Sequence, residues 1–104
     1  MIVTKETEKF AVWFINLDDE QARAHVRIRA HRLSLGLTGD CKPVGEGVSE
    51  LRIDYGPGYR VYFKDTGQNI IILFCGGDKS TQDADIATAK NLAKMPLEVK
   101  EWKP

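Results

Sequence analysis

The sequence has few cysteines and no long apolar run. Its only cysteines are Cys41 and Cys75, and neither has a second cysteine or a histidine beside it at a metal-binding spacing. We interpret both as reduced, buried thiols. The longest apolar run, Ile70 to Cys75, is too short to cross a bilayer, and charged residues fill the N-terminal stretch where a signal peptide is apolar. These absences predict a soluble, cytoplasmic protein with no metal and no membrane partner.

The sequence also lacks a net charge. Its 15 basic and 15 acidic residues cancel, so a nucleic-acid or membrane partner would have to be bound by a local patch of charge. Phosphate-binding glycine loops, zinc-ligand spacings and nucleophile elbows are missing as well. We therefore expect no cofactor, and none of the familiar catalytic signatures applies.

The composition that is present is typical of one small folded domain. The chain has 104 residues, of which 42% are hydrophobic and 29% are charged, as in ordinary globular proteins. We predict a single domain over residues 1–104. Residues 97–104 are a candidate flexible tail, in which Trp102 either packs on the body or awaits a partner.

The first half of the sequence has the periodicity of helices. Apolar residues recur on one helical face at Phe10, Trp13, Phe14 and Leu17. This spacing predicts a helix from Glu6 to Leu17. Asp18, with Gln21 three residues later, is typical of the start of a second helix, which extends to Leu35 and ends at Gly36. Because the joint is tight, the two helices are expected to form an antiparallel hairpin.

The second half has the alternation of strands. Polar and apolar residues alternate across residues 49–55 and 59–64, whereas residues 70–74 are apolar throughout, as in a central strand covered on both sides. Ser80 or Thr81 is expected to begin a last helix, and Pro96 to stop it. With a short opening strand at Ile2 and Val3, the predicted class is α+β: a helical hairpin, an antiparallel sheet and a C-terminal helix.

One face of this sheet is the candidate site. Alternation places several charged residues and one aromatic ring on the same side of two paired strands, and a lysine beyond the buried strand can reach their rim. These residues are Glu50, Arg52, Asp54, Arg60, Tyr62 and Lys79. Arginines can hold a scissile phosphate and stabilise its transition state, and an aromatic ring can stack on a base. The pattern is therefore suited to RNA cleavage.

A simpler interpretation explains the same residues. Arg52 lies between Glu50 and Asp54, so an ordinary lattice of salt bridges on a solvated sheet accounts for the pattern. Arg23 and Arg27 in the second helix are likewise either RNA-binding residues or part of a solvated helix face. His25 and His31 do not share a helical face, and we expect both at the surface.

Three sequence blocks then point to a family. They are KPVGEGVSELRI (42–53), GPGYRVY (56–62) and GGDKSTQDADI (76–86). In this order and at this spacing they resemble the RelE/ParE toxin superfamily, in the branch of HigB-like addiction-module killer proteins. The aromatic first helix and the arginine-rich second helix also fit, so the resemblance extends over nearly the whole chain.

The resemblance implies a fold, an activity and partners. Similar proteins have a helical hairpin packed on a curved antiparallel sheet, and they bind an antitoxin, often a HigA-like helix-turn-helix protein. Many are mRNA interferases: metal-independent endoribonucleases that cut mRNA in the ribosomal A site and so inhibit translation. Ribosome and mRNA are then the other partners. Arg60, Arg52 and Lys79 match basic positions of the family, and Glu46 or Glu50 is the candidate general base.

Two alternatives remain open at the level of sequence. Instead of a nuclease, the protein is then a ParE-like, non-enzymatic inhibitor of DNA gyrase, or it is an inactive toxin that only binds its antitoxin. Where several cleaving relatives carry a tyrosine or histidine near the start of the last helix, this sequence has Asp83 and Asp85. An arginine adjacent to a glutamate also lowers its pKa, whereas a general base needs a pKa near neutrality.

Overall fold

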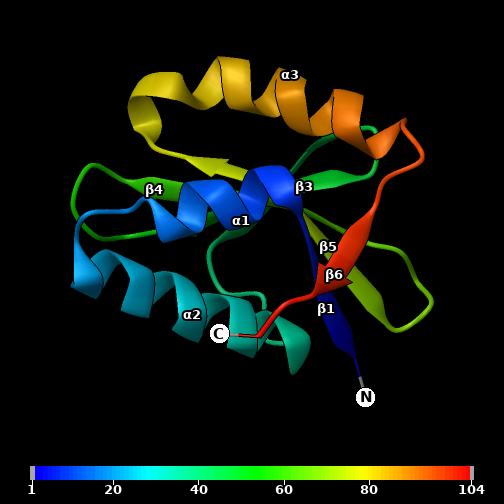
Figure 1. The fold of residues 1–104 in the computed structure, drawn as a ribbon, viewed down its shortest axis with the longest axis horizontal. Coiled ribbons are helices and arrows are strands. Elements are labelled where there is room, and N and C mark those ends of the chain that lie inside the picture. Colours follow the sequence, from blue (N-terminus) through cyan, green and yellow to red (C-terminus); the bar gives the residue numbers. More distant parts are fainter. Residues whose placement is uncertain (1, 104) are drawn as a thin grey trace.

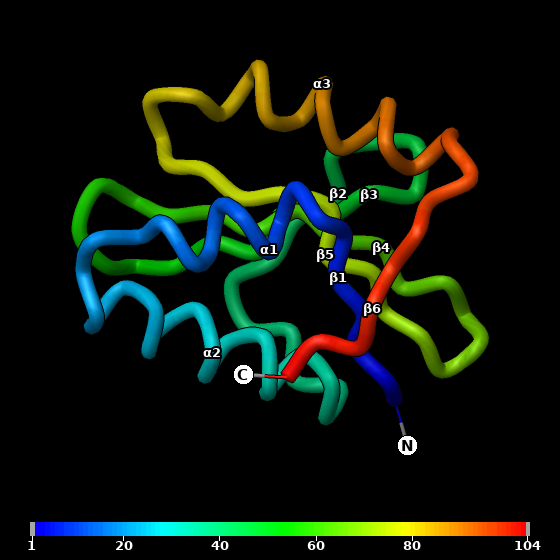
Figure 2. Tube along the Cα trace, in the orientation of Figure 1, coloured from blue at the N-terminus to red at the C-terminus, as the bar shows by residue number. Residues whose placement is uncertain are grey.

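The computed structural model describes residues 2–103 and has the predicted α+β class (Figure 1). Its elements in chain order are β1 (Val3–Thr7), α1 (Glu8–Ile15), α2 (Glu20–Ser34), β2 (Cys41–Gly45), β3 (Val48–Ile53), β4 (Tyr59–Asp65), β5 (Ile70–Gly77), α3 (Gln82–Ala93) and β6 (Val99–Glu101). A single 3₁₀ turn, Lys79–Thr81, precedes α3. The helices α1 and α2 lie side by side and antiparallel (Figures 1 and 2), which confirms the predicted hairpin.

The sheet is mixed, so the prediction of a purely antiparallel sheet is wrong. Its strand order is β2-β3-β4-β5-β1-β6, and β1 runs parallel to β5, with Val3 opposite Ile70. A parallel pair requires a long connection, and here two helices and three strands intervene between the partners. β1 is also longer than predicted, because Lys5 and Glu6 continue the strand without adding to its apolar signal. The central position of β5, between β4 and β1, is confirmed.

Helices cover both faces of the sheet, and each face has its own core. The face toward the helical hairpin buries apolar residues of α1, α2 and the strands: Phe10, Val26, Ala30, Leu33, Leu51, Ile53, Val61, Phe63, Ile71, Leu73 and Trp102. The face toward α3 buries a smaller set: Val48, Tyr62, Phe74, Cys75 and Ala89. We call these the hairpin face and the α3 face.

The helix starts differ in detail from the predictions. Thr7 caps α1, because its Oγ1 accepts a hydrogen bond from the backbone N–H of Phe10 at 3.1 Å. Asp19, rather than Asp18, caps α2 by accepting from the N–H of Gln21 at 2.9 Å. Either aspartate suits an N-cap, and the structure selects the second. Gly36, with φ of 82°, follows the end of α2 as predicted.

The C-terminal segment is packed on the body up to Lys103, so Trp102 takes the first of its two predicted roles; Pro104, the last residue of the candidate tail, lies outside the described residues. β6 pairs with β1, and the backbone N–H of Trp102 donates to the carbonyl of Thr4 at 2.8 Å. The indole is 8% exposed and lies edge-on to Phe14 and Phe10, with ring centroids 4.8 and 5.2 Å away. Burial of this large apolar ring holds the segment to the hairpin face.

The thiols and the last helix complete the fold. Cys75 is buried, as predicted, but Cys41 is half-exposed on the edge strand β2; both are free thiols. α3 packs on the sheet through Ala89 and its apolar neighbours and ends before Pro96. Within residues 2–103, no helix has the length and apolarity that a membrane crossing requires.

Candidate functional site

The candidate site lies at one end of the β3–β4 hairpin. The strand register places Arg52 directly opposite Arg60 and Glu50 opposite Tyr62, which confirms that these four residues share one face. Arg52 and Arg60, together with Asp40, Asp54 and Tyr59, line a depression of about 220 Å³. The turn Gly56–Gly58 closes this end of the hairpin, with φ of 57° at Gly56 and 78° at Gly58.

Part of this face is covered, which corrects the picture of a solvated sheet. α3 packs over it, and both Glu50 and Tyr62 have 0% exposed surface. Burial, and then the charge of Glu50, raise the pKa of the Tyr62 hydroxyl well above its ordinary value. The predicted role of Tyr62 in stacking on an RNA base is therefore wrong, because its ring belongs to the core. Alternation separates two faces of a strand but does not say which face a helix will cover.

Glu50 lies at the centre of a buried polar network. Its Oε1 accepts a hydrogen bond from Arg52 Nε at 3.0 Å. Its Oε2 accepts from the Tyr62 hydroxyl at 3.0 Å and from Gln82 Nε2 at 2.9 Å. Arg60 Nε lies 3.6 Å from the same oxygen. The carboxylate thus has donors from two strands and from the first residue of α3.

This environment makes Glu50 unsuited to general-base catalysis. Burial by itself would raise its pKa, but hydrogen bonds from Gln82, Arg52 and Tyr62 and the charge of Arg60 outweigh burial and lower the pKa below its ordinary value. A general base needs a pKa near neutrality and access to its substrate. Glu50 has neither.

Both arginines have their Nε atom nearest to Glu50. Arg60 is 13% exposed at its side chain, and its Nη1 donates to the carbonyl of Gly58 at 2.8 Å. Arg52 is 35% exposed, and its Nη1 lies 3.9 Å from Asp40. Only Arg52 Nε is within hydrogen-bond distance of Glu50; Arg60 Nε lies 3.6 Å from the carboxylate and is a buried atom without a hydrogen-bond partner, so its contact with Glu50 is an ion pair alone.

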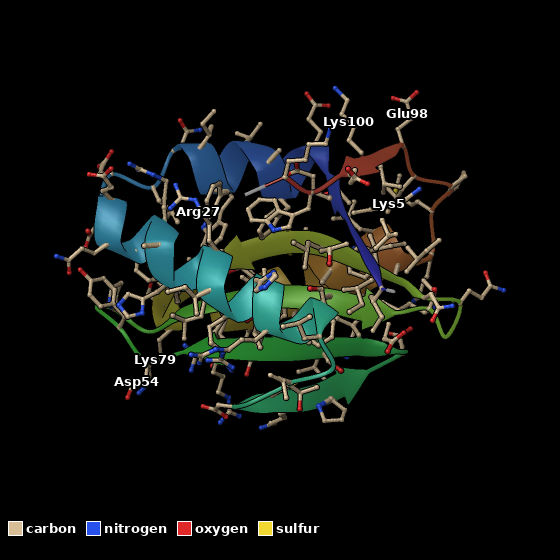
Figure 3. All side chains as sticks on the ribbon, turned by 90° about the horizontal axis from the view of Figure 1, so that it is seen from below. Lys5, Arg27, Asp54, Lys79, Glu98 and Lys100 are labelled. Atoms are coloured by element: carbon tan, nitrogen blue, oxygen red, sulfur yellow. The ribbon has the colours of Figure 1, made fainter. Side chains whose placement is uncertain are left out.

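Lys79 lies beside this pair. β5 ends at Gly77, which is opposite Arg60 in the sheet, so Lys79 follows only two residues later. A Cβ placed on Gly58 would lie 3.3 Å from Arg60 Nη1 and 3.7 Å from the Cβ of Lys79. Lys79 is exposed, and it lies at the same end of the molecule as Asp54 (Figure 3). The structure therefore places the Cβ of Lys79 beside the turn that adjoins Arg60, while Lys79 itself does not line the depression.

Glu46 is far from these cations. It lies in the β2–β3 turn, six residues before Arg52 along the chain, which is roughly 20 Å at the rise of a strand. Its Oε1 is 2.7 Å from Lys94 Nζ, and the hydrogen bond from Lys94 lowers its pKa. The prediction that Glu46 is a catalytic base is therefore not supported by its position or by its pKa.

Arg23 and Arg27 contact the helical hairpin instead of the candidate site. Arg23 Nη1 donates to the carbonyl of Leu17 in the α1–α2 joint. The Arg27 guanidinium lies 5.6 Å from the ring centroid of Phe14 in α1, a distance typical of a cation–π contact. Their predicted role in RNA binding has no support from these contacts.

Contacts of Arg29 and Tyr55 near the site were not predicted from the sequence. Arg29 donates from Nη1 to the carbonyl of Arg52 and so links α2 to the site. The Tyr55 hydroxyl donates to Asp19 at 2.6 Å, and the ring of His25 stacks on Tyr55 at 4.5 Å. His25 is exposed, as predicted, and so is His31. No periodicity connects these residues, so only the fold could have revealed them.

The acidic residues at the start of α3 have local partners. Asp85 Oδ2 accepts a hydrogen bond from the Thr81 hydroxyl at 2.6 Å. A Cβ on Gly77 would lie 1.8 Å from this oxygen, so the close approach requires glycine. Asp83 is exposed. Across residues 2–103, no three His, Cys, Asp or Glu side chains gather as ligands of a metal ion.

Comparison with known proteins identifies one close relative. A Haemophilus influenzae protein, described as an uncharacterized protein, is 50% identical to this chain over 93 residues, covering 89% of the chain and 94% of the relative. No family model matches the sequence, and no solved structure matches it. This level of identity over nearly the full length of both proteins shows that the chain belongs to the same family as the Haemophilus influenzae protein.

Proposed function

We propose that this protein is the toxin of a type II toxin–antitoxin module, of the RelE/ParE superfamily and HigB-like. In this proposal it acts in the cytoplasm as a metal-independent mRNA interferase on the ribosome and is neutralised by a cognate antitoxin. The observation that supports this proposal is the strand register, which places Arg52 opposite Arg60, with Lys79 near the adjoining turn. The two arginines line one depression together with Asp40 and Asp54, and Lys79 lies next to its Gly58 edge; in this proposal the guanidinium groups receive the phosphate.

The chemistry of this cluster suits RNA cleavage. A guanidinium binds phosphate oxygens through two parallel N–H donors, and cationic donors stabilise the charge that develops on a phosphate under attack. In the proposed reaction the ribose 2′-hydroxyl gives its proton to water and attacks the adjacent phosphorus, the bond to the 5′-oxygen breaks, and this oxygen takes up a proton from water. The products are a 2′,3′-cyclic phosphate and a new 5′-hydroxyl end. Arg52, Arg60 and Lys79 hold the phosphate during this exchange.

The test is mapping of 5′ ends on a reporter mRNA in a purified translation system. Wild-type protein should create ends within codons, and only when ribosomes are present. Arg60→Lys keeps the charge beside buried Glu50 but loses the planar fork, and we expect cleavage to slow by about a hundredfold. Lys79→Ala should also slow cleavage. Lys100→Ala is the matched control, because Lys100 is an exposed lysine toward the opposite end of the molecule (Figure 3), and it should cleave like wild type.

The same experiment tests the nuclease, and two further readouts separate the alternatives. The non-cleaving alternatives rest on the observation that neither Glu46 nor Glu50 has the raised pKa of a general base. Intact mRNA with folded wild-type protein would contradict the nuclease proposal. Growth arrest with DNA damage would then support ParE-like inhibition of gyrase. Antitoxin binding without growth arrest would support an inactive toxin.

A further inference from the structure

The pairing of Arg52 with Arg60 poses an electrostatic problem. Like charges directly opposite each other on neighbouring strands are destabilising, and Arg60 is largely buried, with 13% of its side chain exposed. Glu50 offsets the repulsion, because its carboxylate lies close to both guanidinium groups. One of its oxygens faces Arg52 Nε and the other faces Arg60 Nε, at 3.0 and 3.6 Å.

The carboxylate is itself held in place. Tyr62 and Gln82 donate to Oε2 at 3.0 and 2.9 Å, and the side chain of Glu50 is fully buried. Tyr62 belongs to strand β4 and Gln82 is the first residue of α3, so both donors come from rigid elements. A group supported in this way can orient its neighbours, because its own rotamer has little freedom.

We propose that Glu50 is a positioning residue for phosphate binding. It accepts a hydrogen bond from Arg52 Nε and forms an ion pair with Arg60, and so holds two arginines that both line the depression. The inference rests on the proposed function and deepens it, because it replaces a general base at this position with an anchor for the phosphate-binding cations. Gln82 and Tyr62 support the anchor.

A role in charge balance alone makes the opposite prediction. Glu50→Gln removes one negative charge beside the cluster. If Glu50 only neutralised the arginines, this change would strengthen phosphate binding, because the site would become more positive. If Glu50 positions them, the change weakens binding despite the added positive charge. The sign of the effect therefore distinguishes the two roles.

The experiment is titration with inorganic phosphate, followed by NMR at the Nε–H groups of Arg52 and Arg60. Wild-type protein should show saturable shifts at both groups. We expect Glu50→Gln to bind phosphate about tenfold more weakly. This is the lower end of the loss of affinity at metal sites when a residue that supports a ligand is removed. Val48→Ala is the matched control, because Val48 is 1% exposed on the same strand and face; it loses packing without touching the arginines and should bind like wild type. Unchanged or tighter binding by Glu50→Gln, or no shifts in wild type, would overturn the proposal.

Two further measurements do not depend on the folding of Glu50→Gln. In wild type, the Nε–H of Arg52, which donates to Glu50 although its side chain is 35% exposed, should exchange with water more slowly than that of exposed Arg32. Equal exchange rates would refute the anchoring. Glu50→Asp keeps the charge but withdraws the carboxylate, so it should also weaken phosphate binding, whereas charge balance predicts no change. These readouts involve no mRNA, so intact mRNA would refute the nuclease while leaving the test of Glu50 unaffected.

Discussion

The two faces of the sheet differ in the polarity of the side chains that they bury. The hairpin face buries mostly apolar side chains, including the rings of Phe10 and Trp102, and its buried polar neighbour on β1 is Thr4, opposite Ile71. The α3 face buries an ionised carboxylate, a tyrosine hydroxyl and part of two arginines in addition to its apolar residues. One sheet thus separates an apolar core from a partly polar one.

The difference shows what each face contributes. Burial of apolar surface stabilises a fold without requiring a particular geometry. A buried charge is costly unless it is paired and hydrogen-bonded, and such a pair often stabilises no better than apolar residues of the same size. The network around Glu50 is therefore poorly explained by stability alone. Its value lies in the fixed placement of Arg52 and Arg60, next to the surface where they are needed.

The largest expected effect tests the hairpin face. Phe10 has no exposed surface and contacts three other aromatic rings. Phe10→Ala should lower the free energy of unfolding by about 3–5 kcal/mol, measured by urea denaturation. Val12→Ala is the control on the same helix, because Val12 is 51% exposed, and it should have little effect. Equal losses from the two variants would show that α1 does not bury Phe10 as described.

A smaller effect, dependent on pH, should be confined to the α3 face. The pKa of Glu50 is lowered from its ordinary value of 4.5, so the ionised carboxylate contributes stability that is complete above pH 4.5 and is lost as the pH falls through the lowered value. Urea denaturation at several pH values should show wild type more stable than Glu50→Gln near neutrality, with the difference shrinking in acid. The loss caused by Phe10→Ala should change little over the same range. A constant difference between wild type and Glu50→Gln would contradict the lowered pKa.

The smallest expected effect concerns the joint between the two helices of the hairpin. Asp19 caps α2 and also accepts a hydrogen bond from Tyr55, so Asp19→Ala should lower the Tm by a few degrees. Asp18→Ala should leave the Tm unchanged, because Asp18 is exposed and is not the cap. Thermal unfolding followed by circular dichroism measures both. A larger loss of Tm in Asp18→Ala than in Asp19→Ala would show that Asp18 is the N-cap of α2, as the sequence predicts.

The sequence predicted elements whose signals are local. The periodicity of Phe10, Trp13 and Phe14 predicted α1, and continuous apolarity predicted β5 as a central strand. Alternation also predicted that Arg52 and Arg60 share a face. Each of these features follows from side-chain direction within one element or one hairpin, so no knowledge of distant segments was needed.

Features that depend on distant segments were missed. The parallel pairing of β1 with β5 was missed, as was the pairing of β1 with β6, which joins the two ends of the chain. The burial of Glu50 and Tyr62 depends on α3, which follows them by about twenty residues or more in the sequence. Glu46, which looked equivalent to Glu50 as a carboxylate near the cations, lies at the opposite end of β3 and pairs with Lys94.

By itself, the sequence determined the helical hairpin, the strands of the β3–β4 hairpin and the shared face of the two arginines, because backbone geometry dictates side-chain direction over short distances. Only the tertiary structure decided that α3 covers this face and that Glu50 becomes an anchor with a lowered pKa. Burial and pKa depend on every segment that packs against a residue, and those segments come from separate parts of the chain.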